Sequence, residues 1–276
     1  MKLRFAKMHG LGNDFMVVDL VTQRGMPTPE QVRTWSDRRT GVGFDQLLAV
    51  LPPSDPDADF RMRIFNADGS EAEQCGNGAR CFARFVVEEE LTVKRDLLLE
   101  TEGGSIRTEL QGGEQVRVDM GVPSMEPATV PFLADEVATS YVVDLGSDCV
   151  EVTPVSMGNP HAVVFVDNVS RADIEGVGSA LQHHERFPEQ VNVGFLQVVD
   201  RRFGRLRVYE RGVGETRACG SGACAAMVAA RLHDRFESRA KISLPGGKMR
   251  LEWQGRGSPA TLSGPTQFVY TGRIEL

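Results

Sequence analysis

The sequence predicts an α+β protein of two pseudo-symmetric halves, each a mostly antiparallel sheet around one helix. Two observations lead to this fold class. The 276 residues contain an internal repeat, because EAEQCGNGA at 71–79 returns as ETRACGSGA at 215–223. In addition, short strand-like runs are joined by glycine-rich turns such as Gly103-Gly104, which favour antiparallel hairpins.

Two further markers extend the repeat along the chain. Gly12-Asn13 before a hydrophobic run returns as Gly158-Asn159, and VGFDQLLAV at 42–50 is matched more weakly by VGFLQVV at 193–199. Ordered markers at a nearly constant offset indicate two related halves, each with its own core. We expect domains at residues 1–120 and 121–263, with the boundary near Gly121.

Strands are expected wherever short apolar runs are bounded by turn residues. These runs are residues 15–20, 46–51, 60–65, 97–101, 116–120, 162–166, 193–199, 206–209 and 241–244. Helices stand out in two places only. One begins near Gly76 and has an apolar side through Val87, and its counterpart runs from about Gly220 to His233.

The composition excludes several classes of function. Lys and Arg number 31 against 38 Asp and Glu, and the net charge of -7 argues against sequence-independent binding to nucleic acid or to an anionic membrane. No apolar stretch approaches the roughly 18 residues that span a bilayer, and the amino terminus lacks the apolar block of a signal peptide. We therefore expect a cytoplasmic protein.

The five cysteines do not form the pattern of a secreted disulfide framework, because their number is odd and the chain is long. Cys75 and Cys219 correspond under the repeat. Cys81, Cys149 and Cys224 do not, and we expect them to be small packing residues.

The repeated Cys-Gly-x-Gly-Ala segments are typical of a reactive thiol at a helix start. Small residues leave the N–H groups of the first helical turn open beside the sulfur. That positive helix end is expected to lower the thiol pKa and to bind a carboxylate. Two such thiols on opposite faces of one carbon, Cys75 and Cys219, suit a racemase or epimerase, in which one removes a proton and the other returns one.

Other uses of these segments are less favoured. The cysteine spacing has no CxxC and no close His pair, which disfavours a metal site and a thiol–disulfide enzyme. The stretch after Cys219 fits a loose dinucleotide fingerprint, but its first-half copy does not, and we treat it as a false match. Neither segment has a lysine for a pyridoxal phosphate Schiff base, so catalysis without a cofactor is the economical interpretation.

Five ordered motifs resemble the diaminopimelate epimerase family. They are HGLGNDF from His9, RRTGVGFDQ from Arg38, FNADGSEAEQCGNGARC from Phe65, GNPHAV from Gly158 and YERGVGETRACGSGACA from Tyr209. The resemblance implies a pyridoxal-phosphate-independent enzyme that interconverts LL- and meso-diaminopimelate, on the route to lysine and, in bacteria, to peptidoglycan. It also implies that the final strand, about 264–276, returns to the first domain, and that the protein is a homodimer.

Carried onto matching positions, the resemblance makes Cys75 and Cys219 the acid/base pair. The backbone N–H groups of Gly76, Asn77, Gly220 and Ser221 would bind the carboxylate at the reacting carbon. His161 would lie beside the site and support the protonation state of a thiol. The remaining substrate-binding positions are Asn13, Gln46, Asn66, Asn159, Asn192, Glu210 and Arg211.

These side chains match a substrate with two ammonium and two carboxylate groups. Arg211 can hold a carboxylate through two N–H groups, and Glu210 can accept from an ammonium. Ser221 stands where the family commonly has threonine, and both offer a hydroxyl. The residues leave open which cysteine is the base in which direction.

Two rival functions remain at this point. A proline or hydroxyproline racemase or epimerase of the same architecture would not need Glu210, Arg211 and several amides for its simpler substrate. A thiol redox sensor or a ligand-binding module without catalysis would be favoured by loss of either repeated cysteine or of Arg211, and all three are present.

Overall fold

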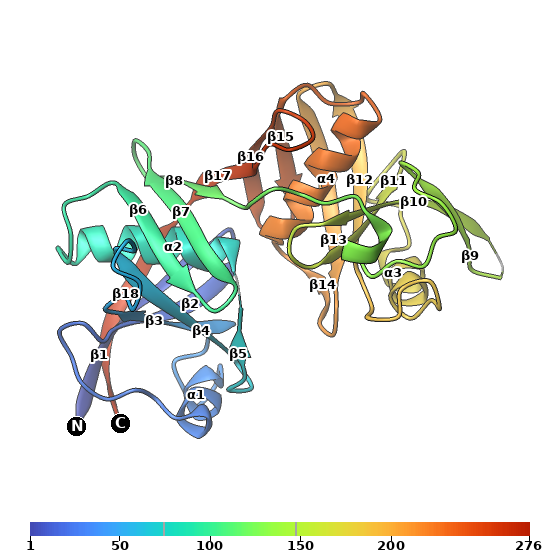
Figure 1. The fold of residues 1–276 in the computed structure, drawn as a ribbon. Coiled ribbons are helices and arrows are strands. Elements are labelled where there is room, and N and C mark those ends of the chain that lie inside the picture. Colours follow the sequence, from blue (N-terminus) through green and yellow to red (C-terminus); the bar gives the residue numbers. More distant parts are fainter. Residues whose placement is uncertain (74, 147) are drawn as a thin grey trace. The chain divides into compact units, whose positions relative to one another are not determined.

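The computed structural model describes residues 1–73, 75–146 and 148–276. The chain forms two compact units. The first comprises Met1–Asp119 together with Ser263–Leu276, and the second comprises Met120–Leu262. Figure 1 labels the helices and strands of both units.

A curved sheet forms the frame of the first unit. Along the sheet the order is β18, β1, β2, β3, β4, β6, β7 and β8, and the short β5 also pairs with β4. The pairs β2–β3 and β4–β6 are parallel and the others are antiparallel. The bounds are β1 Lys2–Gly10, β2 Asn13–Asp19, β3 Gln46–Leu51, β4 Phe60–Asn66, β5 Glu71–Ala72, β6 Asp96–Thr101, β7 Gly104–Leu110, β8 Gln115–Asp119 and β18 Gln267–Glu275.

Two helices cover opposite faces of this sheet. Helix α2 (Gly76–Glu88) contacts β1, β2 and β3 and also β7 and β8, so the sheet curls around it. Helix α1 (Pro29–Ser36) packs Val32 and Trp35 into a cluster with Met16 and Val18 of β2. Because β2 and β3 are buried on both faces, their sequences are continuous apolar runs rather than alternating ones.

The second unit repeats the same plan. The order β10, β11, β12, β13, β15 and β16 has parallel pairs at β11–β12 and β13–β15 and antiparallel pairs elsewhere, and β9 and β14 add to β10 and β13. The bounds are β9 Tyr141–Asp144, β10 Cys149–Ser156, β11 Pro160–Phe165, β12 Asn192–Asp200, β13 Phe203–Glu210, β14 Gly214–Thr216, β15 Arg239–Leu244 and β16 Gly247–Trp253. Strand β17, Ala260–Pro265, contains the boundary between the units. A short 3-10 turn, Pro127–Thr129, precedes β9.

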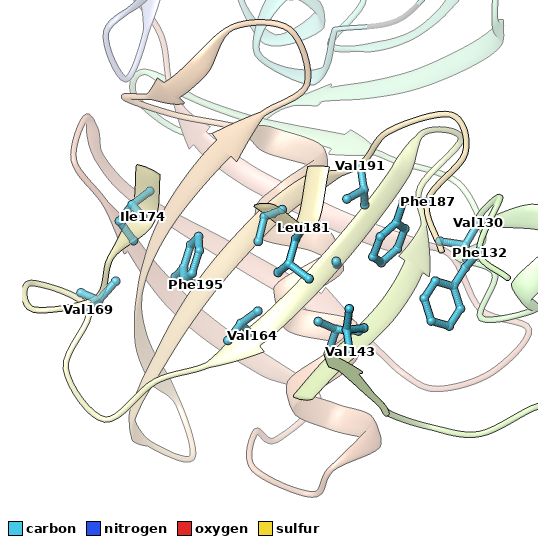
Figure 2. Packing of buried hydrophobic residues seen from close by; sticks show 13 residues of the cluster. Val130, Phe132, Val143, Val164, Val169, Ile174, Leu181, Phe187, Val191 and Phe195 are labelled. Atoms are coloured by element: carbon cyan, nitrogen blue, oxygen red, sulfur yellow. The ribbon is translucent and has the colours of Figure 1, made fainter. Parts of the chain in front are cut away.

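Helix α4 (Gly220–Leu232) contacts β10, β11, β12, β13 and β16, as α2 does in the first unit. Helix α3 (Ile174–Gln182) closes the opposite face. Its side chains Ile174 and Leu181 join a core with Val164 of β11 and Phe195 of β12 (Figure 2). Each unit therefore has one inner helix, one outer helix and a sheet between them.

The structure confirms the α+β class, the predicted strands and both predicted helices. The glycine turns do join antiparallel hairpins, such as β6–β7 through Glu102 and Gly103, after which Gly104 begins β7. Helices α1 and α3 were not expected, although Thr28 and Asp173 cap them with side-chain oxygens. One prediction for a cysteine was wrong. Cys149 is exposed, since it lies in the part of β10 that precedes the strand's buried residues, whereas Cys81 and Cys224 are fully buried as expected.

Within the described residues, no helix has the length and apolar character needed to cross a membrane.

Candidate active site

Each repeated cysteine is the N-cap residue of an inner helix. Cys75 caps α2, and its Sγ accepts a hydrogen bond from the backbone N–H of Gly78 at 3.2 Å. Cys219 caps α4, and its Sγ accepts from the N–H of Gly222 at 3.4 Å. A sulfur takes the place of the oxygen that usually caps a helix, so each thiol lies at the positive end of its helix.

The second glycine of each motif makes room for the sulfur. A Cβ at Gly78 would lie 3.3 Å from Cys75 Sγ, and a Cβ at Gly222 would lie 3.2 Å from Cys219 Sγ. Both distances are tighter than ordinary van der Waals contacts, so a larger residue would press on the sulfur. The repeated glycines thus leave room for the thiols at these positions.

A matched ion pair fastens the hairpin before each cysteine. Arg63 donates to both carboxylate oxygens of Glu71, at 2.7 Å each, across β4 and β5. Arg207 donates to both oxygens of Glu215, at 2.6 Å each, across β13 and β14. The glutamates belong to the repeat recognised in the sequence, whereas the arginines, which stand at the same 144-residue offset, were not predicted.

The first unit gathers its predicted substrate-binding side chains at one end of β2, β3 and β4. Gln46 begins β3 beside Asn66, the last residue of β4, and Gln46 Nε2 donates to Asn66 Oδ1 at 2.9 Å. Asn13 begins β2, and its Oδ1 accepts from Nδ2 of Asn77 in the first turn of α2 at 3.2 Å. The sheet end and the helix start therefore meet at these amides.

A charged network that was not predicted from the sequence holds this end of the sheet. Arg38 binds both oxygens of Asp14, at 3.0 and 2.8 Å, and also binds Asp45 at 2.6 Å, while Lys7 bonds to Asp14 from the buried side. Burial opposes ionisation of Asp14, but the hydrogen bonds from Arg38 and Lys7 lower its pKa well below the usual range. Asp45 in turn accepts from Nδ2 of Asn13 at 2.9 Å.

The predicted residues of the second unit also lie together. Asn159 donates to the Ser221 hydroxyl at 3.4 Å, and its Oδ1 lies 3.0 Å from Nε2 of His161. His161 pairs with Asn192 across β11 and β12, and Asn192 Oδ1 accepts from the backbone N–H of Arg211 at 2.9 Å. The Arg211 guanidinium donates to the carbonyl of Glu189 at 3.0 Å.

The electrostatics of Cys219 differ from the sequence-based expectation. Burial raises its pKa well above that of an ordinary thiol, and the nearby Glu210 carboxylate raises it further. The N–H of Gly222 and the hydroxyl of Ser221 act in the opposite direction and do not overcome burial. The expected lowering of the thiol pKa at the helix end is therefore wrong for Cys219, which is held as a thiol. Glu210 itself accepts a hydrogen bond from the Thr216 hydroxyl.

His161 is neutral in this structure. Burial, and to a lesser extent the charge of Arg211, lowers its pKa to about 3. Because Asn159 Oδ1 can only accept, Nε2 of His161 carries the proton and Nδ1 keeps its lone pair. Nδ1 is buried and has no partner among the described residues.

Across residues 1–73, 75–146 and 148–276, no group of three or more His, Cys, Asp or Glu side chains is arranged to hold a metal ion.

Comparison with known proteins places the chain in one family. The family model described as diaminopimelate epimerase matches residues 5–126 and 153–269. Proteins named diaminopimelate epimerase from Stutzerimonas stutzeri (strain A1501) and Ectopseudomonas mendocina (strain ymp) are each 57% identical to it over 276 residues, 100% of both chains.

The fold is shared more widely than the sequence. A crystal structure of a probable proline racemase from Agrobacterium radiobacter K84, with bound carbonate, has a TM-score of 0.71 at 17% identity. The alignment covers 99% of this chain and 93% of that one. At that identity the likeness concerns the fold alone, whereas the full-length relatives and the family model concern the sequence. The chain with the two helix-capping cysteines belongs to the diaminopimelate epimerase family.

Proposed function

We propose that this chain interconverts LL- and meso-diaminopimelate without a cofactor, exchanging the proton at one α-carbon between the thiols of Cys75 and Cys219. The observation that carries the proposal is the repeated geometry of the two cysteines, each capping an inner helix. Family membership over the full length supports the substrate, since the relatives at 57% identity are named diaminopimelate epimerases. Diaminopimelate lies on the route to lysine, which is the proposed biosynthetic role.

The reaction needs one thiolate and one thiol at a time. The thiolate removes the α-proton, the electron pair of the broken C–H bond passes into the carboxylate, and the other thiol donates its proton to the opposite face. Each cysteine then carries the opposite charge state, so the return reaction uses them in exchanged roles. The raised pKa of Cys219 supports its role as the proton donor from the state described here.

Helix starts are suited to stabilise the charge that builds on the carboxylate. We propose that the backbone N–H groups of Gly76 and Asn77 on α2, and of Gly220 and Ser221 on α4, bind its oxygens. Because the negative charge increases as the proton leaves, these groups bind the transition state more tightly than the substrate.

The other end of the substrate carries an ammonium and a carboxylate that do not react. Arg211 donates one N–H to the Glu189 carbonyl. This bond holds the guanidinium in place, and its other N–H groups can bind a carboxylate. We propose that Glu210 accepts from the ammonium and that Asn13, Gln46, Asn66, Asn159 and Asn192 complete the recognition.

His161 is proposed to support proton transfer by a thiol. A neutral imidazole with a buried Nδ1 lone pair can accept a hydrogen bond from a thiol or share its proton. The fixed bond from Nε2 to Asn159 would keep the ring in the tautomer that this role requires.

The rival functions have less support. A proline racemase shares the fold at 17% identity, but no observation of this chain favours its substrate. A redox sensor or a binding module would not require two thiols held by the same capping bond and the same glycine contact.

Deuterium exchange tests the proposal directly. Purified protein with LL-diaminopimelate in deuterated water and no added cofactor should form meso-diaminopimelate and incorporate deuterium at one α-carbon. Cys75→Ala and Cys219→Ala should each abolish epimerisation, and Cys149→Ala, at an exposed thiol, should leave it unchanged. Absence of both conversion and exchange in the unaltered protein would overturn the proposal, and near-normal activity of either active-site variant would overturn the two-thiol mechanism.

The oligomeric state is proposed on family grounds, and the cellular setting on the charge and hydropathy of the sequence. We expect a cytoplasmic homodimer that acts on a small molecule and binds neither nucleic acid nor membrane. Light scattering after size-exclusion chromatography should give twice the chain mass of 30.3 kDa. A mass of 30.3 kDa at micromolar concentration would contradict the dimer.

A further inference from the structure

Arg80 is a fully buried arginine of α2 that the proposed reaction does not use directly. Its Nη1 donates to the carbonyl of Pro265 at 3.0 Å, and its Nη2 donates to Oδ1 of Asn77 at 2.6 Å. The backbone leaves space for the guanidinium at two glycines, because a Cβ would lie 2.1 Å from Nη1 at Gly264 and 3.1 Å from Nη2 at Gly10. Burying a guanidinium is costly unless its hydrogen bonds are made, and the Pro265 carbonyl and the Asn77 amide oxygen accept two of them.

The hydrogen bonds that start at Arg80 run in one direction. A guanidinium can only donate, so the side of the Asn77 amide that faces Arg80 must be its oxygen. Nδ2 of Asn77 then donates to Oδ1 of Asn13 at 3.2 Å. Nδ2 of Asn13 in turn donates to the Asp45 carboxylate at 2.9 Å. With a donor-only group at one end and an acceptor-only group at the other, each amide has a single orientation.

The second unit has no arginine–asparagine pair at the corresponding positions of its sequence. Under the 144-residue repeat, Ser221 stands at the position of Asn77 and Cys224 at the position of Arg80. Both residues of the Asn77–Arg80 pair are therefore different in the second half. Asn159, which corresponds to Asn13, donates to the Ser221 hydroxyl at 3.4 Å. A hydroxyl donates or accepts by rotating and needs no partner to orient it, whereas an amide has distinct ends.

We propose that Arg80 is a positioning residue that, with Asp45 at the other end of the series, fixes the amide orientations of Asn77 and Asn13 for substrate binding. This inference rests on the proposed epimerase function, because it assigns Arg80 to the same site. It predicts that loss of Arg80 acts on the reaction through Asn77 rather than through general destabilisation.

A double-mutant cycle tests the route of the effect. Steady-state kcat and KM for LL-diaminopimelate are measured for the unaltered protein, Arg80→Met, Asn77→Ser and the double variant. We expect each single variant to lower kcat/KM by about tenfold or more, mainly through KM, as for loss of a hydrogen bond to a charged group. The kcat/KM of the double variant should be no more than about threefold below that of the more impaired single variant, because either single change already removes the Arg80–Asn77 hydrogen bond. If the fall in kcat/KM of the double variant equalled the product of the two single-variant falls, the proposal would be overturned.

Two conservative variants separate positioning from folding. Arg80→Lys keeps a donor-only group and should retain more of kcat/KM than Arg80→Gln, whose amide can donate or accept and does not fix Asn77. Equal losses of kcat/KM in Arg80→Lys and Arg80→Gln would overturn the proposal. It would also be overturned if the loss of kcat/KM correlated with the fall in melting temperature and not with whether the new side chain can only donate. Arg84→Met, one turn further along α2 on a partly exposed side chain, is the matched control and should stay within about twofold of the unaltered protein.

The outcomes also separate this inference from the proposed function. If the unaltered protein does not convert LL-diaminopimelate, the proposed function fails. If it does and Arg80→Met has near-normal kcat and KM, only the role of Arg80 fails.

Discussion

Arg207 and Glu215 form a two-bond ion pair, with both N···O distances at 2.6 Å, on the hairpin that leads to Cys219. The pair is partly exposed, so its contribution to the free energy of unfolding is small, about 1 kcal/mol or less. Its importance lies in geometry, because a bidentate pair fixes both the position and the plane of the two groups.

We therefore expect Glu215→Gln to affect the reaction more than stability. A displacement of the hairpin end would move Cys219 and Glu210 together, and misplacement of reacting groups by less than 1 Å lowers kcat by roughly tenfold or more. Steady-state kinetics and thermal melting check this. Glu237→Gln, which breaks the exposed pair with Arg202, is the control and should change neither quantity. A large fall in melting temperature with unchanged kcat would contradict the expectation.

Gly78→Ala should separate activity from stability in a different way. Alanine in place of glycine in a helix is favourable by about 1 kcal/mol, but the new Cβ would lie 3.3 Å from Cys75 Sγ and 3.2 Å from Leu48. We expect kcat to fall by roughly tenfold as the sulfur shifts, with little change in melting temperature. Gly112→Ala, where nothing lies within 4 Å, is the control. Unchanged kcat in Gly78→Ala would show that the sulfur position tolerates the contact.

Much of the fold follows from local sequence signals. The glycine turns predicted the hairpins, and the repeat predicted that Cys75 and Cys219 would begin equivalent helices. Helix α1 was missed even though Thr28 and Gln31 form a capping box and Pro29 stands at the start of the helix. Its signal was present, but the helix is short and only two of its residues, Val32 and Trp35, are buried.

The rest depends on contacts between distant residues, which spacing does not reveal. Four charged residues from separate segments become one network because β1, β2 and β3 are neighbours in the sheet: Lys7, Asp14, Arg38 and Asp45. The pKa of Cys219 is a balance between the helix end, which the motif predicted, and burial, which only the packed structure sets.

Replacing Glu210 should show how much of the raised Cys219 pKa comes from its charge. In Glu210→Gln the carboxylate is absent, and we expect the thiol pKa to fall, though burial still holds it above the ordinary value. The rate of iodoacetamide alkylation of the Cys219 peptide, followed by mass spectrometry against pH, reports the thiolate. Its midpoint should move to lower pH, while Glu185→Gln, at an exposed carboxylate, should leave it in place. A midpoint that stays or rises would assign the shift to burial alone.

His161 should make the protein less stable as the pH falls below neutral. Burial, with a smaller effect from Arg211, lowers its pKa to about 3 in the folded state, against about 6.5 in an unfolded chain. The unfolded state therefore takes up a proton below about pH 6.5 that the folded state does not, which costs roughly 1.4 kcal/mol per pH unit down to the folded pKa.

The stability that this neutral histidine provides is thus complete above about pH 6.5 and is lost progressively as the pH falls toward 3. Urea unfolding at pH 7.5 and pH 5.0 measures the loss. In His161→Gln the difference in unfolding free energy between the two pH values should be smaller by roughly 1–2 kcal/mol. His183→Gln, at an exposed histidine on the same unit, should leave the difference unchanged. If His161→Gln keeps the full pH dependence, His161 is not held neutral in the folded protein, and its buried Nδ1 lone pair could not serve a thiol.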